Sequence, residues 1–285
     1  MKHLFCFGFG YSARALAARL DKRAWEISAT SRDPEGIAEI NAQDFHSFLF
    51  DGKLQIAPDV THLLISVPPD ENGDPVLNLY RENLRKIAKQ LQWVGYLSTT
   101  GVYGDRGGDW VDEDSPLEPN TARGYRRLEA ERSWMKLHIN HGLLVHLFRL
   151  AGIYGPGRNQ FISVLNGSAK RIIKAGQIFS RIHVDDIAGV LAASMAKPNP
   201  GRAYNVCDDE PCPPQEVVEY AANLLGMPVP PEIPFEQAEL SPMAKSFYAD
   251  SKRVSNKRIK NELGYKLLYP NYRDGLSALK SQLTR

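Results

Sequence analysis

The sequence is poor in cysteine and contains no long hydrophobic run. Its three cysteines, Cys6, Cys207 and Cys212, are too few and too scattered for a disulfide framework. The spacing of Cys207 and Cys212 is also poor for zinc, so we expect no metal site, and a reducing cytoplasm fits this cysteine content best. No run of about 18 apolar residues occurs, so we expect no membrane span, and the short apolar run at the amino terminus does not predict a secretory leader.

The chain also lacks a marked excess of either charge. It has 35 Lys and Arg residues against 33 Asp and Glu residues, which gives a net charge of +2. This balance favours neither nucleic acid nor an anionic membrane as a partner, so a small molecule is the expected ligand. With 43% hydrophobic and 24% charged residues, the 285 residues suffice for one large domain or two modest ones.

Apolar runs typical of buried strands alternate with helical patterns along the first two thirds of the chain. We expect strands at 3–8, 25–32, 61–67, 93–104, 143–155 and 202–208, and helices at 11–20, 75–91, 122–140 and 183–196. This alternation predicts an α/β fold with a doubly wound parallel sheet of the Rossmann type.

The alternation stops after residue 207, where prolines become frequent. They are Pro211, Pro213, Pro214, Pro228, Pro230, Pro231 and Pro234. We therefore expect a Rossmann domain over residues 1–207 and a smaller C-terminal substrate lobe over residues 208–285, to which residues 156–180 also contribute.

A glycine-rich segment, "FGFGYSAR", lies between the first expected strand and the first expected helix. In it Gly8 permits a tight turn, Gly10 lets the backbone approach a pyrophosphate, and Ala13 is small enough for close packing of helix and strand. The pyrophosphate would lie at the helix N-terminus, beside Tyr11 and Ser12. The position of this pattern predicts a dinucleotide site, although the pattern alone would also suit a plain glycine turn.

The second expected strand ends in "TSR", which bears on the choice of cofactor. An acidic residue at this place accepts a hydrogen bond from the ribose 2′-hydroxyl and repels a 2′-phosphate. Here Arg32 can pair with a 2′-phosphate and Ser31 can donate a hydroxyl, which favours NADP over NAD. Asp33 follows and weakens this preference, and Arg32 would also suit an ordinary surface charge.

Five segments together resemble the extended short-chain dehydrogenase/reductase family, the group of nucleotide-sugar epimerases and dehydratases. They are "GFGYSAR" (8–14), "LSTTGVYG" (97–104), "FRLAGIYGPGR" (148–158), "SRIHVDDIA" (180–188) and "AYNVCDDEP" (203–211). They follow the family's order and cover most of the chain. The resemblance implies that Thr99 hydrogen-bonds a substrate hydroxyl or carbonyl and that Asn83 is a structural asparagine near the site. It also implies contacts to the cofactor from Ser66, Val67, Ser98, Ala151 and Gly152.

The family's Tyr-x-x-x-Lys pair is broken in "TARGYRRLEAERSW" (121–134). Anchored on Tyr125, the pattern gives an acidic partner one turn later, which would raise the phenol pKa. If Glu131 is aligned with the family's downstream glutamate, Arg127 takes the lysine position and could hold the ribose. The tyrosine position is then Arg123, which cannot act as an acid near neutral pH. We prefer this second reading, in which Tyr125 lies about 200° around the helix from the catalytic position.

The proton donor is therefore open. Tyr103 and Tyr125 are the catalytic candidates besides Thr99, and Tyr103 would equally suit a packing role. Arg158, at a Gly-Pro loop, and Arg253, in a late basic segment, are candidate contacts to an anionic substrate. We expect an NAD(P)-dependent epimerase, dehydratase or reductase that acts on a sugar-like or carbonyl substrate. A non-catalytic cofactor sensor, a scaffold with an empty cleft, and either a monomer or a homodimer remain open.

Overall fold

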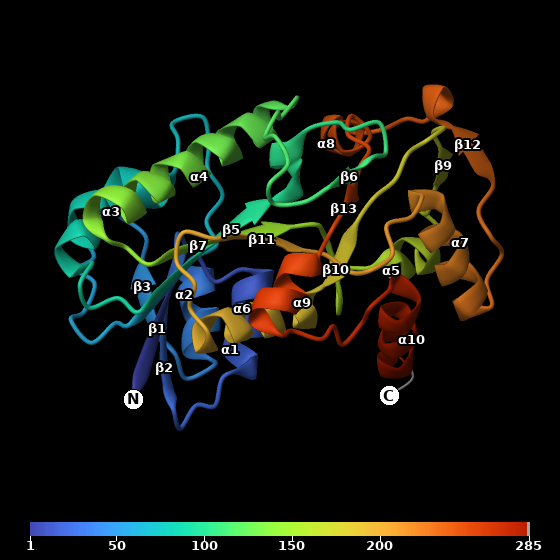
Figure 1. The fold of residues 1–285 in the computed structure, drawn as a ribbon. Helices are drawn as coiled ribbons and strands as arrows, with labels where there is room; N and C mark the ends of the chain where they lie inside the picture. Colours follow the sequence, from blue (N-terminus) through green and yellow to red (C-terminus); the bar gives the residue numbers. More distant parts are fainter. Residues whose placement is uncertain (284–285) are drawn as a thin grey trace.

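A seven-stranded parallel sheet forms the centre of the molecule in the computed structural model, which describes residues 1–283 but not the side chains of Pro242 and Met243. In chain order its strands are β1 (Lys2–Phe7), β2 (Trp25–Ser31), β3 (His46–Leu49), β4 (His62–Ile65), β5 (Trp93–Thr99), β7 (Val145–Leu150) and β11 (Ala203–Val206). Their spatial order is β11-β7-β5-β4-β1-β2-β3, and every neighbouring pair is parallel (Figure 1). The central strands are apolar along their length because this sheet is buried on both faces.

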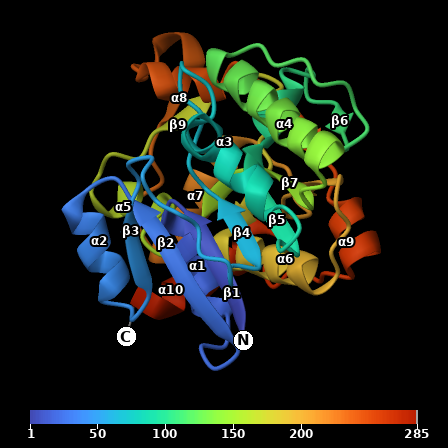
Figure 2. The same cartoon turned by 90° about the vertical axis from the view of Figure 1, so that its left-hand side faces the viewer.

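Helices cover both faces of this sheet. One face carries α3 (Pro75–Ile87) and α4 (Ala122–His141), and the other carries α1 (Tyr11–Arg19), α2 (Pro34–Asn41) and α6 (Val184–Ala196) (Figure 1). Alternate residues of β1 face opposite sides of the sheet. Leu4 and Cys6 pack with α1 and α6, whereas Phe5 and Phe7 pack with α3. Figure 2 shows the strands side by side, from β3 on the left towards β7 on the right. The predicted doubly wound α/β fold is confirmed.

Local sequence signals start several of these helices. Asp33 caps α2, Asp74 caps α3 and Thr121 caps α4, each by accepting a hydrogen bond from a first-turn backbone N–H. Proline follows both aspartates, at the position where its missing N–H has no cost to the helix. Helix α4 ends at Gly142, whose φ of 72° lies in the left-handed region that favours glycine.

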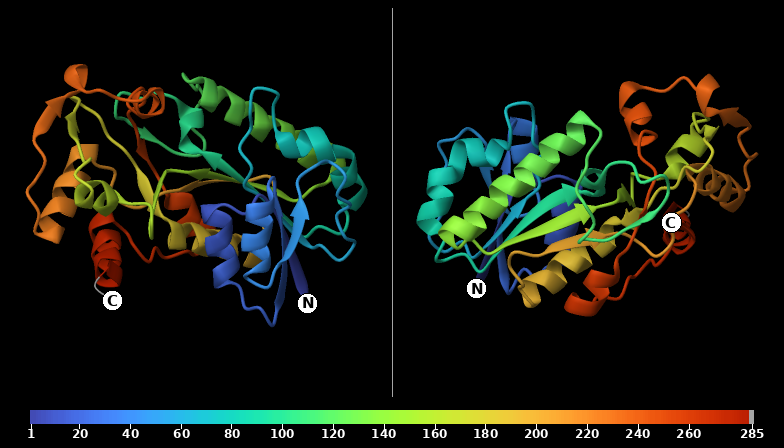
Figure 3. Two further views of the ribbon diagram at one scale, coloured as in Figure 1. Left: turned by 180° about the vertical axis from the view of Figure 1, so that it is seen from behind. Right: turned by 45° about the horizontal axis from the view of Figure 1, so that its top comes forward.

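The remaining elements build a smaller lobe at one end of the sheet (Figure 3). Three short parallel ribbons lie outside the central sheet: β8 (Gly152–Tyr154) with β10 (Arg181–His183), β6 (Trp110–Val111) with β13 (Arg253–Val254), and β9 (Arg171–Ile173) with β12 (Glu232–Pro234). The other helical elements are η1 (Thr100–Tyr103) and α9 (Lys257–Leu263), whose buried residues join the core of the sheet, and α5 (Gln160–Leu165), α7 (Pro214–Leu225), η2 (Phe235–Gln237), α8 (Pro242–Phe247) and α10 (Tyr272–Leu283). Residues of α5, α7 and α10 share a separate hydrophobic core.

The chain does not remain in this lobe after residue 207. Helix α9 packs on β11 and α6, and its Ile259 and Leu263 belong to the same core as Leu4 of β1. The segment after residue 207 thus contributes to both parts of the molecule. The boundary at residue 207 stays a prediction, and the last two residues of the predicted lobe, 284 and 285, lie outside the described residues. Across residues 1–283, no helix combines the length and the apolar character needed to cross a membrane.

Candidate functional site

The candidate site begins where the strand order reverses beside β1. Strand β1 lies between β2 and β4, and the chain order of the strands reverses there. Open α/β sheets bind ligands at this reversal, in the crevice outside the carboxyl ends of the strands. Here Gly8 has a φ of +81°, and its N–H donates to Thr30 Oγ1 at 2.9 Å. A Cβ atom on Gly8 would lie 3.0 Å from Ser66 Oγ and 3.1 Å from Val67 Cγ2. Ser66 Oγ in turn donates to the Gly8 carbonyl at 2.9 Å, so Ser66 and Val67 hold the loop close to β4.

Gly10, at the start of α1, faces open space. It is the N-cap residue, no side chain caps the helix, and the first turn contains no acidic residue. A Cβ atom on Gly10 would meet nothing within 4 Å. Ser12 and Ala13 are buried on the inner side of this turn. The backbone N–H groups of the first helical turn are therefore open to an anion, and the residues present fit a dinucleotide pyrophosphate.

Two charged side chains follow the end of β2: Arg32, which has no hydrogen-bond or ion-pair partner among the described residues, and Asp33, which caps a helix. Asp33 Oδ1 accepts from Gly36 N at 2.7 Å and thereby caps α2. Ser31 Oγ accepts from Asp33 N at 3.4 Å and lies where a Cβ on Gly36 would fall. Within residues 1–283 Arg32 is exposed and has no hydrogen bond or ion pair. An arginine without a partner in the described part of the chain and a carboxylate that uses one oxygen in a helix cap therefore lie next to each other at this edge of the sheet.

Thr99 ends β5 at the same edge of the sheet. Its Oγ1 accepts from Gly101 N at 3.2 Å and caps the short helix η1, which leaves the hydroxyl proton available to donate. Thr99 pairs in register with Leu150, the last residue of the neighbouring strand β7, so Ala151 and Gly152 follow directly after the end of that strand. Ala151 is buried and Gly152 is exposed. Thr99 and these two residues thus share the carboxyl end of the sheet with the glycine loop.

Helix α4 turns Arg127, and not Tyr125, towards the sheet. Arg127 is buried, and its Nη1 donates to Leu97 O at 2.8 Å and to Tyr96 OH at 3.1 Å. Glu131, one turn later on the same face, is buried as well. Tyr125 is 57% exposed and points away from this face. Tyr125 and Arg127 thus lie on different faces of α4, and the register that puts Arg123 and Arg127 at the family's tyrosine and lysine positions stays a prediction.

Ser98 and Tyr103 belong to a buried polar network beneath the site. Ser98 Oγ donates to Glu131 Oε1, and Arg149 binds the same carboxylate with Nη2 2.9 Å from Oε2. Arg149 Nη1 donates to Tyr103 OH at 2.9 Å, and Tyr103 OH donates to Asn205 Oδ1 at 2.7 Å. All of these side chains are buried.

This network surrounds two residues that the sequence singled out. The hydroxyl protons of Ser98 and Tyr103 are donated to Glu131 and Asn205, and the cofactor contact expected of Ser98 and the proton-donor role considered for Tyr103 stay predictions. Burial raises the pKa of Tyr103 to about 12, despite the hydrogen bond from Arg149. The Glu131–Arg149 ion pair was not expected, although Arg149 within the apolar run "HLFRLAG" was a signal that a charge is buried there.

Three other candidate residues lie in different places. Arg158 lies in the loop after β8, with its Cζ 6.0 Å from the centre of the Tyr11 ring, so it adjoins the glycine loop. Asn83, on α3, donates to Gln55 Oε1 at 3.0 Å, and Arg253, on β13, donates to the Gly108 carbonyl. Within the described part of the chain, no hydrogen bond or ring contact joins Asn83 or Arg253 to the other candidate residues.

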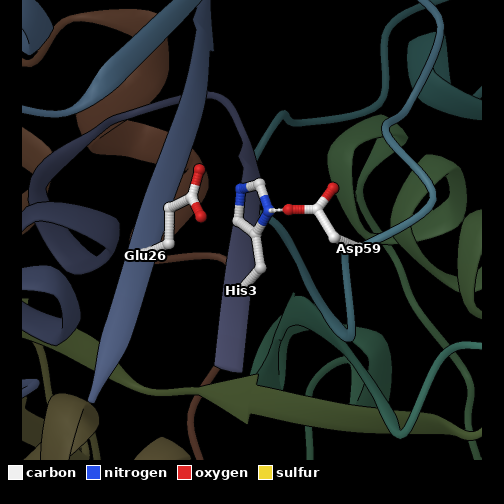
Figure 4. A group of neighbouring side chains, drawn as sticks. All are labelled: His3, Glu26 and Asp59. Atoms are coloured by element: carbon white, nitrogen blue, oxygen red, sulfur yellow. Dashed lines mark hydrogen bonds and ion pairs between the residues drawn. The ribbon is translucent and has the colours of Figure 1, made fainter. Parts of the chain in front are cut away.

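A cluster of possible metal ligands lies at the opposite end of β1. Atoms of His3, Glu26 and Asp59 lie within 4.8 Å of one another (Figure 4). His3 Nδ1 is 3.0 Å from Asp59 Oδ2, and His3 Nε2 is 2.7 Å from Ser28 Oγ. Because both ring nitrogens already have protein partners, we assign no metal ion to this cluster.

The comparisons with known proteins agree with this geometry. The chain belongs to the NAD dependent epimerase/dehydratase family, whose model matches residues 8–207. Protein YeeZ of Escherichia coli strain K12 is 28% identical over 289 residues, which cover 95% of this chain and 97% of that protein. The solved structure of a functionally unknown conserved protein from Silicibacter pomeroyi is 54% identical, with a TM-score of 0.95 over 99% of each chain.

A more distant structure shares the fold. The human epimerase family protein solved with NADPH is 17% identical, with a TM-score of 0.76 over 99% of each chain. The family match confirms the predicted membership of the epimerase and dehydratase group, and this likeness shows the shared fold.

Proposed function

We propose that the protein is an NADP(H)-dependent oxidoreductase that acts on a small carbonyl or sugar-like substrate, in the manner of an epimerase, a dehydratase or a reductase. The observation that carries this proposal is the loop from Gly8 to Tyr11. It lies where the strand order reverses, and no described side chain caps the backbone N–H groups of the helix that follows it. Thr99 lies at the same edge with a hydroxyl proton to donate. The sensor alternative finds no support in the family match.

The residues of the crevice would hold the cofactor in a defined way. The first-turn amides after Gly10 would bind the pyrophosphate, and Ala151 and Gly152 would lie beside the nicotinamide. The bound cofactor would supply or accept a hydride. Arg127 uses one nitrogen for Leu97 and Tyr96, and its remaining N–H donors would be available to the ribose.

The preference for NADP rests on Arg32 and Asp33. Among the described residues Arg32 has no partner, and the adjacent carboxylate of Asp33 is engaged in capping α2. A 2′-phosphate would give Arg32 a charge-assisted bidentate partner. NAD would leave the guanidinium without one.

Thr99 is the residue that we propose to hold the reacting oxygen of the substrate. Its hydroxyl is oriented by the hydrogen bond from Gly101 and keeps its proton for an acceptor. Tyr103 is buried with its proton committed, and Tyr125 faces solvent, so we propose neither as the acid.

Turnover with a panel of carbonyl compounds tests this proposal. Purified protein is mixed with NADPH and keto sugars or simpler ketones, and with NADP⁺ and hydroxyl-bearing sugars. Net reduction is followed by NADPH absorbance, and epimerised or dehydrated sugar, which forms without net change of the cofactor, is followed by chromatography of the products. We expect turnover with at least one class, and a kcat lowered about 100-fold in Thr99→Val with no change in NADPH affinity, because one donor to the reacting oxygen is lost. The adjacent Thr100→Val is the control. NADPH binding without turnover on any compound would contradict the enzyme proposal.

A further inference from the structure

Three arginines around the crevice have no carboxylate partner. Many arginines of this chain are paired with acids, among them Arg14 with Glu39 and Arg132 with Glu129. Within residues 1–283, no ion pair engages Arg123, Arg127 or Arg158. Arg127 is satisfied by neutral oxygen acceptors, whereas the guanidiniums of Arg123 and Arg158 have no hydrogen-bond acceptor among the described residues.

Arg123 lies on the first turn of α4, one turn before Arg127. Its Cζ is 5.7 Å from the centre of the Phe247 ring, which belongs to α8 of the smaller lobe. The first turn is held against the end of β5, because a Cβ atom on Gly124 would lie 2.8 Å from the Gly101 carbonyl oxygen. Arg123 is thus placed between the Thr99 turn and the smaller lobe, with its N–H donors free.

Arg158 belongs to a loop that is held against the glycine loop. The backbone N–H and carbonyl groups of Gly155 and Arg158 bond each other at 2.9 and 3.0 Å. Tyr11 OH donates to Pro156 O at 2.8 Å, and Asn159 Nδ2 donates to Gly155 O at 2.8 Å. The guanidinium lies over the Tyr11 ring. The first turn of α4 and the loop after β8 therefore each carry an arginine whose guanidinium lies over an aromatic ring.

The charges of these arginines act on one another. Arg123 stays exposed as a residue, but neighbouring atoms desolvate its guanidinium and lower its pKa, and the positive charges of Arg127 and Arg158 lower that pKa further. Positive charges that act on one another in this way favour a bound counter-ion. An anion bound between them would remove the repulsion and supply the missing acceptors.

We propose that Arg123 and Arg158 together bind an anionic group of the substrate, a phosphate or a carboxylate, at the mouth of the cofactor crevice. The proposal rests on the proposed function for the identity of the ligand as substrate. At the position where the family carries its tyrosine, this chain carries a guanidinium, which binds an anion and transfers no proton near neutral pH. The site therefore selects substrates that combine a reducible or oxidisable carbon with a negative charge.

The test is calorimetric titration with two probes, inorganic phosphate and malonate, at constant ionic strength. Each probe is added to the free protein and to protein incubated with saturating NADPH. The variants are Arg123→Gln and Arg158→Gln, and the control is Arg132→Gln, which removes the same charge from an exposed position of α4. Thermal unfolding of each variant confirms that it folds.

We expect at least one probe to bind both with and without NADPH, and each of the two variants to weaken it at least tenfold while the control changes it less than twofold. Binding of neither probe, or equal loss in the control, would overturn the proposal. Loss of probe binding on addition of NADPH, with weaker NADPH binding in Arg123→Gln, would also overturn it, because the arginines would then hold the phosphates of the cofactor. If the protein bound no NADPH but kept Arg123-dependent probe binding, the anion site would stand and the proposed cofactor would fail.

Discussion

The buried ion pair between Glu131 and Arg149 gives a prediction whose size follows from its surroundings. The two residues are 2% and 4% exposed, and the carboxylate also accepts from Ser98. Glu131→Gln leaves Arg149 as a buried charge without a counter-ion. Breaking such a pair from one side costs about 3–5 kcal/mol, and we expect a loss of about 3 kcal/mol because glutamine keeps one acceptor oxygen.

The same helix offers a matched control. Glu129 pairs with Arg132 on the solvent face, where the side chains are 67% and 59% exposed. Glu129→Gln makes the same chemical change and should cost less than about 1 kcal/mol, because exposed pairs contribute little. Urea unfolding of both variants, followed by circular dichroism, measures the difference. If Glu131→Gln unfolded within 1 kcal/mol of the wild type, the interpretation of this pair as a structural element beneath the site would be wrong.

A double variant separates the pair from its surroundings. Glu131→Gln combined with Arg149→Met removes both charges, so no unpaired charge remains buried. The loss should be smaller than the sum of the two single losses by at least about 1 kcal/mol. Additive losses would show that the two side chains do not stabilise each other.

Two further predictions concern the glycine loop and a buried acid. Gly8→Ala should lower the free energy of unfolding by about 1–2 kcal/mol, because Gly8 has a positive φ and a Cβ atom there would press on Ser66. Gly10→Ala should change the free energy of unfolding by less than about 0.5 kcal/mol but weaken NADPH binding at least tenfold. Urea unfolding and NADPH titration measure these effects, and equal losses of stability in the two variants would contradict the assigned roles. Burial raises the pKa of Asp208 from 3.8 to about 8, so the folded chain keeps a proton that the unfolded chain loses. Stability should therefore fall as pH rises between about 4 and about 8, and Asp208→Asn should flatten this slope in urea midpoints; an unchanged slope would show that Asp208 is already ionised.

Within the central sheet, the sequence predicted the strands that are buried on both faces and missed β3, which is not. Continuous apolar runs identified β1, β4 and β7, whereas β3 (His46–Leu49) is short and largely exposed, and neither it nor α2 was expected. The strand expected at 93–104 ends at Thr99, because Thr99 caps the turn that follows. Hydrophobicity alone does not mark such an end within an apolar run.

The candidate site was predictable where its residues are neighbours in the chain. The glycine loop and the end of β2 follow from local sequence, and so does the displacement of Tyr125 around α4. The partners of Ser98 and Tyr103 were not predictable, because Glu131 and Asn205 reach them only through the fold. The contact between Arg123 and the Phe247 ring was not predictable either, because Phe247 belongs to α8, far along the chain.

The most direct test of the account is a titration of the purified protein with NADPH and NADH, followed by energy transfer from its tryptophans. The wild type should bind NADPH at least tenfold more tightly than NADH, and Arg32→Asp should reverse or abolish this preference. Arg81→Asp, an exposed charge reversal on α3, is the control and should change neither affinity. Equal affinities that Arg32→Asp leaves unchanged would contradict the NADP assignment, and binding of neither nucleotide would contradict the proposed oxidoreductase.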